Sequence, residues 1–168
     1  MNLQKEYLQF MENMTPKLKL VDVPLEHLIV DHLCYRTETP EDYKQHQAAF
    51  MEMSAAYTKG EHNGREFHQF WLKEPVRYEW GGQVHTVEFP SPGGSANYET
   101  GIQHIEVLAT EPLFLLMNNA IVDEFRFTSK SGDETYLSWS NKSAFKITEK
   151  PLFMKSIVDD KHELTYLT

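Results

Sequence analysis

The sequence predicts an α+β domain built from two similar halves, each with a strand, a helix and three further strands. The first observation is a pattern shared by Val30–Tyr35 and Ile102–Val107, in which apolar and polar residues alternate around a histidine. The second is that each copy precedes a helix start and then three strand-like segments. We therefore expect a single domain over residues 1–168, with one half at 28–92 and the other at 98–150.

An N-terminal helical segment, residues 1–27, comes before the first half. From Leu3 to Met14 the large apolar side chains recur at helical intervals, which is typical of a helix that packs one face on a core. Pro16 lacks the backbone N–H that an interior helical position uses, so we expect the helix to end before it.

The first half begins with a strand at about 28–35. Thr39 and Pro40 then form a helix start, because threonine can cap free N–H groups and proline suits the first helical position. We expect this helix to run to about Tyr57. The expected strands that follow are 67–72, 76–80 and 83–89, with a hairpin at Gly81 and Gly82.

The second half repeats this order. A strand at about 102–107 precedes Thr110 and Pro112, which form a similar helix start, and the helix is expected over 113–122. The expected strands are 124–128, 135–139 and 144–148, and a last helix is expected over about 152–160 within the C-terminal segment 151–168.

Composition argues against several classes of partner. Sixteen Lys and Arg against 25 Asp and Glu give a net charge of −9, which repels nucleic acid and anionic membranes. A single cysteine, Cys34, cannot form an internal disulfide. No apolar run reaches the roughly 18 residues of a membrane helix, and the first residues do not resemble a signal peptide. We expect a cytoplasmic protein.

His32 and His104 occupy matching places in the two leading strands. Alternate residues of a strand share a face, so His32 is expected beside Val30 and Cys34 and away from the apolar Leu33. If a pseudo-two-fold axis relates the halves, the two histidines meet in one concave site, where neutral imidazoles can bind a divalent metal. The alternative is two separate, half-buried histidines, each bonded to a neighbour.

Glu88 is the candidate carboxylate for that site. It stands on an expected strand between the apolar Val87 and Phe89, where burying a carboxylate without a partner would be costly. Two histidines and one carboxylate leave coordination positions open for water or substrate, as catalytic metals require.

Several motifs together indicate a family. They are Val30-Asp31-His32, Asn63-Gly64-Arg65, Glu74-Pro75-Val76, residues 87–92 and residues 98–107. In combination and in order, over about 31–158, they resemble the YecM-like proteins, a branch of the vicinal-oxygen-chelate superfamily. That superfamily also holds glyoxalase I, extradiol dioxygenases and bleomycin-resistance proteins.

The resemblance implies two βαβββ modules whose strands curl into a cup-shaped mixed sheet, with helices on its outer face. It implies metal ligands on the first and fourth strands of each module. Carried over by residue, these are His32, Glu88 and His104, holding a divalent metal such as Zn, Ni, Mn or Fe.

The fourth ligand position departs from the superfamily pattern. Aligning the last strand with that of Glu88 puts Lys146 where an acid belongs, with Thr148 two residues on and Glu149 off-register. A site with the three ligands His32, Glu88 and His104 is still expected. The alternative is that Lys146 pairs with Glu88, which would abolish the metal site.

Glu106 and Arg36 are the remaining candidates near the histidines. Glu106 shares a face with His104 and is assigned as a catalytic base, the alternatives being a fourth ligand, a residue that orients a ligand, or a structural glutamate. Arg36 is assigned to an anionic substrate, the alternative being a structural ion pair. His68 and His85 are expected to face solvent or to lie in hairpins.

The expected function is that of a metal-dependent isomerase, lyase or oxygenase acting on a small molecule. A non-catalytic protein that binds a small molecule or metal in the same cup is the first alternative, and a metal-free structural domain is the second. We expect a monomer in preference to a homodimer.

Overall fold

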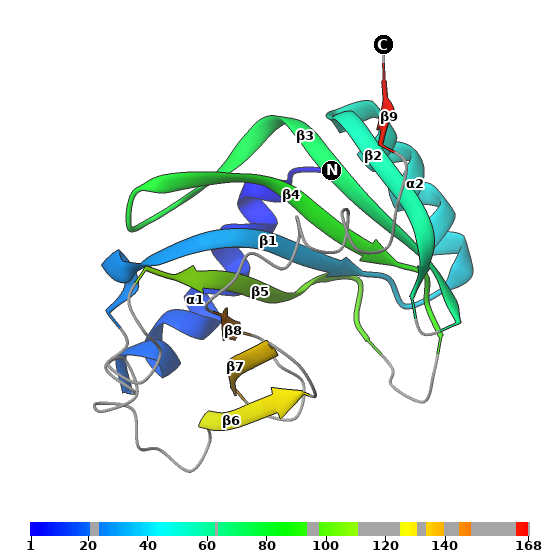
Figure 1. The fold of residues 1–168 in the computed structure, drawn as a ribbon. Coiled ribbons are helices and arrows are strands. Elements are labelled where there is room, and N and C mark those ends of the chain that lie inside the picture. The colour runs from blue at the N-terminus through cyan, green and yellow to red at the C-terminus, as the bar shows by residue number, and fades with distance from the viewer. Residues whose placement is uncertain are drawn as a thin grey trace.

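The computed structural model describes residues 1–20, 24–62, 64–93, 98–110, 125–130, 134–139, 145–148 and 164–167. They form an α+β fold, as expected, with helices packed on one mixed sheet (Figure 1). In chain order the elements are α1 (Leu3–Leu20), the 3-10 turn η1 (Leu25–His27), β1 (Leu28–Arg36), α2 (Pro40–Met53), β2 (Ser54–His62), β3 (Arg65–Tyr78), β4 (Gly82–Pro90), β5 (Gly101–Ala109), β6 (Phe125–Lys130), β7 (Glu134–Trp139), β8 (Phe145–Thr148) and β9 (Thr165–Tyr166).

The nine strands follow the order β6-β7-β8-β5-β1-β4-β3-β2-β9 across the sheet. β1 is parallel to β4, which continues antiparallel into β3 and β2. On the other side β5 is parallel to β8, which continues antiparallel into β7 and β6. The two sides meet where β1 and β5 pair antiparallel at the centre. Strand order is therefore the same on both sides of that central pair.

The hydrophobic core lies between the sheet and its helices. Figure 1 shows α1 behind β1 and β5, and α2 against β2 and β3. Alternate residues of the central strands are buried on this side; they include Leu33 and Tyr35, Phe70 and Leu72, Val87 and Phe89, and Ile105 and Val107. Phe50 of α2 packs among them, with ring centroids 5.1–5.2 Å from those of Tyr35, Phe70 and Phe89.

The expected end of the first helix at Pro16 is wrong, because α1 continues through that residue to Leu20. Pro16 is exposed, and the buried stripe of Tyr7, Met11 and Met14 continues one turn beyond it to Leu18. Burying this stripe offsets the hydrogen bond that proline cannot make.

No helix among the described residues is long and apolar enough to cross a membrane.

The second helix starts as expected but ends earlier. Thr39 caps it by accepting a hydrogen bond from the Asp42 N–H at 3.1 Å, whereas the helix stops at Met53 instead of reaching Tyr57. Residues 54–62 form β2, a strand that the sequence analysis missed. Its buried positions carry small or polar residues, Ser54, Ala56 and Thr58, which lack the β-branched apolar signal of a core strand.

Two segments of the first half that were expected to form separate strands belong to a single strand. Residues 67–72 and 76–80 were expected to be separate, but β3 runs from Arg65 to Tyr78, with a register irregularity between Trp71 and Val76. The hairpin between β3 and β4 is confirmed, and Gly81 there has φ +92°, which a side chain would disfavour.

In the second half, β5 to β8 lie close to the expected strand positions. The helices expected at 113–122 and 152–160 lie outside the described residues. The short strand β9 pairs with β2 at the sheet edge and was not expected.

Candidate metal centre

A bulge precedes each of the two histidines. Where β1 pairs with β5, Asp31 is skipped between Val30 and His32, and Gln103 is skipped between Ile102 and His104. Each extra residue reverses the alternation of faces. Val30 therefore joins the hydrophobic core, and the expectation that it shares the face of His32 is wrong.

The central pairing then brings four chemically active side chains together. His32 is paired with Glu106, and Cys34 is paired with His104, all four on the face opposite the core cluster. β4 lies beside β1 and pairs Glu88 with Cys34. All of these residues are buried except Glu88, whose side chain is 19% exposed.

His32 is fully buried and held at both ring nitrogens. Its Nδ1 lies 2.8 Å from Asp31 Oδ2, a hydrogen bond in which the ring N–H donates. Its Nε2 lies 3.3 Å from Glu88 Oε2 and 3.8 Å from Glu106 Oε1. A carboxylate on one ring nitrogen fixes the tautomer and aims the other, which is how metal-binding histidines are commonly oriented.

His104 approaches the same carboxylate from the other strand. Its Nε2 lies 3.5 Å from Glu106 Oε1. This separation and that between His32 and Glu106 are longer than the usual hydrogen bond of about 2.9 Å. They are close to the roughly 3.4 Å between neighbouring donors on a tetrahedral ion with bonds of about 2.1 Å. The spacing therefore fits metal ligands.

The pKa values of His32 and Glu88 are shifted in opposite directions. Burial by itself would lower the pKa of His32, but the carboxylates of Glu88 and Glu106 and the hydrogen bond to Asp31 more than offset it, and the pKa lies well above its ordinary value. Burial by itself would raise the pKa of Glu88, yet the neighbouring His32 holds that pKa below its ordinary value. Each shift favours the charged form of its group, and the two groups lie 3.3 Å apart.

Two overlapping groups have donors placed for a cation. One donor atom from each of His32, His104 and Glu106 lies within 4.8 Å of the others, and the same holds for Cys34, Glu88 and His104. Imidazole, carboxylate and thiolate donors suit Zn and neighbouring transition metals. The structure is therefore compatible with a metal site at this cluster, and it does not identify the metal.

Cys34 lies on the face of His32 as expected, although its sequence neighbourhood, which contains no motif, led to no ligand role. It occupies in β1 the place that Glu106 occupies in β5, two residues after the histidine. Glu106 also lies where expected, beside His104.

The second half has a lysine at the position corresponding to Glu88. β8 pairs Lys146 with Glu106, just as β4 pairs Glu88 with Cys34. The register therefore agrees with the alignment made from sequence. The side chain of Lys146 and all of Glu149 lie outside the described residues, so the alternative pairing of Lys146 with Glu88 stays a prediction.

Three other sequence candidates have partners of their own. Arg36 follows Cys34 by two residues on β1, and its guanidinium lies 4.3 Å above the ring of Tyr98. His68 was expected to face solvent, which is wrong: it is buried under α2, and its Nδ1 lies 2.9 Å from the Tyr43 hydroxyl. His85 is partly buried, stacked on Trp71.

Comparison with known proteins identifies a family model described as "YecM protein", which matches residues 1–135. A solved chain described as "Structural Genomics, Protein EC4020" has a TM-score of 0.76 and 18% identity, with 95% of this chain and 91% of that chain covered. A solved "putative dioxygenase from Bacillus subtilis" has a TM-score of 0.43 and 16% identity, covering 73% of this chain and 41% of that one. No curated protein matches.

Proposed function

The chain belongs to the YecM family, and on that premise we propose that it binds one divalent metal ion between His32 and His104 and uses it to hold a small molecule. The observation that carries this proposal is the buried group of His32, His104 and Glu106, whose donor atoms lie within 4.8 Å of one another. Such a group costs stability unless it is paired or coordinated, so a bound cation gives its burial a function.

In this proposal His32, His104 and Glu106 are the primary ligands. Two imidazoles and one carboxylate leave positions open for water or substrate. Sequence reasoning assigned the ligand role to Glu88 and the base role to Glu106. The reverse assignment is favoured because a single oxygen of Glu106, Oε1, lies 3.8 Å from His32 Nε2 and 3.5 Å from His104 Nε2, so that it faces both imidazoles.

Glu88 would then move protons. Its Oε2 lies 3.3 Å from His32 Nε2, and its side chain is the most exposed of the cluster, so it can exchange protons with solvent or substrate. Asp31 would keep the His32 ring in place through the bond to Nδ1. A divalent ion bound here supplies a Lewis acid that polarises an oxygen of the small molecule.

We infer a metal-dependent isomerase, lyase or oxygenase of the vicinal-oxygen-chelate type. Support comes from the equivalent strand order on the two sides of the β1–β5 pair and from the bulge before each histidine. The proposal includes a second βαβββ module, with its helix at 113–122, and a chain that closes its cup as a monomer.

A non-catalytic binding protein is the second candidate. One observation favours it: the register position that corresponds to Glu88 carries Lys146, so the second half contributes no acid there. A protein of this kind would bind the same metal and small molecule without turning the molecule over.

Metal analysis of the untagged protein tests the proposal. After dialysis against Zn²⁺, Mn²⁺ or Ni²⁺ we expect about one ion per chain for at least one of them, and almost none in the His32→Ala/His104→Ala double variant. His85→Ala, a histidine of β4 outside both donor groups, is the matched control and should bind as the unaltered protein does. Equal metal content in all three proteins would refute the site.

Turnover separates the two candidate functions. The metal-loaded protein is assayed with hemithioacetals, catechols and 2-oxo acids. Conversion that is lost in the Glu88→Gln variant, with metal retained, supports the enzyme. Saturable binding of one of these compounds without conversion supports the binding protein.

A further inference from the structure

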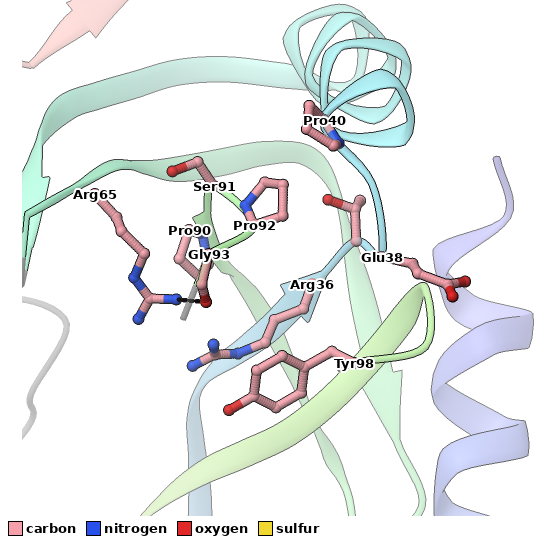
Figure 2. A pocket seen from close by; sticks show the side chains of 10 residues that line it. Arg36, Glu38, Pro40, Arg65, Pro90, Ser91, Pro92, Gly93 and Tyr98 are labelled. Carbon is pink, nitrogen blue, oxygen red and sulfur yellow. Dashed lines mark hydrogen bonds between the residues drawn. The ribbon is translucent and has the colours of Figure 1, made fainter. Parts of the chain in front are cut away.

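A second polar site lies at the ends of the strands that carry the metal centre. A cavity of about 270 Å³ opens where β1 and β4 end, and its lining includes Arg36, Glu38, Arg65, Pro90, Gly93 and Tyr98. Figure 2 shows the guanidinium groups of Arg36 and Arg65 on the same side of it, whereas the carboxylate of Glu38 points away. Two cationic groups thus converge in a chain whose net charge is −9.

Both arginines are fixed by neighbours that leave hydrogen-bond donors available. The guanidinium of Arg36 lies 4.3 Å above the ring of Tyr98, a stacking that restrains the plane without using its N–H groups. Arg65 donates one Nη1 hydrogen bond to the carbonyl of Gly93 at 3.2 Å. A planar guanidinium held in this way can bind a carboxylate or phosphate with two parallel hydrogen bonds.

We propose that this cavity binds the carboxylate or phosphate group of a small organic anion. This inference extends the proposed function, and it rests on that function for the claim that the bound anion is a substrate. Arg36 follows Cys34 by two residues on β1, and Pro90 follows Glu88 by two residues on β4, a step of about 7 Å along each strand. One molecule can therefore present an anionic group here and oxygen atoms to the metal centre.

Calorimetric titration of the chelator-treated, metal-free protein tests the anion site directly. Inorganic phosphate and succinate are the probes, each at constant ionic strength. We expect saturable one-site binding of at least one of them. Binding of phosphate alone assigns a phosphorylated ligand, and binding of succinate alone assigns a carboxylate.

Three charge-removing variants locate the binding. Arg36→Gln and Arg65→Gln should each weaken it by roughly tenfold or more, because each removes a charged hydrogen-bond donor. Arg77→Gln removes an exposed arginine of β3 outside the cavity and should leave binding unchanged. Since Arg36 and Arg65 come from different strands, either variant tests the cavity if the other fails to fold.

The proposal is overturned if neither anion binds saturably, or if Arg36→Gln and Arg65→Gln bind as Arg77→Gln does. Because these titrations contain no metal, their failure leaves the metal centre standing. Conversely, loss of the metal centre in the double-histidine test leaves the anion result standing.

Discussion

His32 lies directly opposite Glu106 across the β1–β5 pair, with its Nε2 3.8 Å from the Glu106 Oε1. Two positions along, Cys34 lies opposite His104. Antiparallel pairing of two similar strands thus places each histidine next to the residue that follows the other histidine by two. The only difference between the two sides of this quartet is that β1 carries Cys34 where β5 carries Glu106.

This relationship makes Glu106 the shared carboxylate of the two imidazoles. The Glu106→Gln variant should lose most of its metal, because a neutral amide replaces a charged ligand. Glu88→Gln should retain about one ion per chain. Metal content after dialysis, measured side by side, checks the assignment. If Glu88→Gln loses the metal and Glu106→Gln keeps it, the roles given by the sequence are the correct ones.

Asp31 should matter for metal affinity although it is not a ligand. It bonds His32 Nδ1 at 2.8 Å and so aims Nε2 into the cluster. We expect Asp31→Asn to lower metal affinity roughly 10–100-fold, as loss of such orienting partners commonly does. Competition with a chelator of known affinity measures the change. Glu74→Gln, an exposed position on β3, is the control, and equal affinities of the two variants would contradict the role.

His68 should make the protein less stable in mild acid. Burial lowers its pKa below the ordinary 6.5, despite the opposing effect of Glu66. Below about pH 6.5 the unfolded chain therefore binds a proton at this residue that the folded chain does not, so stability falls as pH falls.

The raised pKa of His32 has the opposite effect on the pH dependence of stability. The test therefore compares the unaltered chain with the His68→Gln variant. Denaturant unfolding of the metal-free protein at pH 7.5 and pH 5.5 should show a smaller loss of stability in His68→Gln than in the unaltered chain. The same loss in both would exclude His68 as its source.

Phe50 should be a major contributor to stability. Its side chain is 0% exposed and packs edge-on or tilted against Tyr35 and Phe89 and parallel to Phe70. Phe50→Ala should cost about 3–5 kcal/mol in the free energy of unfolding. Gln45→Ala, exposed on the same helix, should change it by less than about 0.5 kcal/mol. A cost for Phe50→Ala as small as that of Gln45→Ala would argue against this core.

Pro16 should be a site where the chain can be stabilised. It is exposed inside α1, where proline removes one backbone hydrogen bond. Pro16→Ala should raise the free energy of unfolding by about 1–3 kcal/mol. Thermal or denaturant unfolding checks this, and a loss of stability on this substitution would contradict the prediction.

The sequence was sufficient for the features that strong local signals specify. Thr39 and Pro40 marked the start of α2, and the paired glycines marked the hairpin before β4. It was insufficient where tertiary contacts override local preference. Burial of Leu18 carried α1 past Pro16, and pairing with β3 drew Ser54 and its neighbours into a strand.

For the site, the two histidines and both glutamates were found from their registers alone, whereas the bulges were missed. Val30 and Leu33 are both apolar but three residues apart, as are Ile102 and Ile105. A regular strand cannot bury both members of such a pair on one face, so this spacing was the available sign of a bulge. Cys34 was placed on the face of His32, but it received no ligand role because a lone cysteine carries no motif.

The most direct test of the central claim is an anomalous difference map from crystals of the metal-loaded protein, collected at the absorption edge of that metal. The account predicts one peak bonded to the Nε2 atoms of His32 and His104 and to a carboxylate oxygen of Glu106. Well-ordered His32 and His104 rings with no peak between them, or a peak only at another place on the chain, would contradict it.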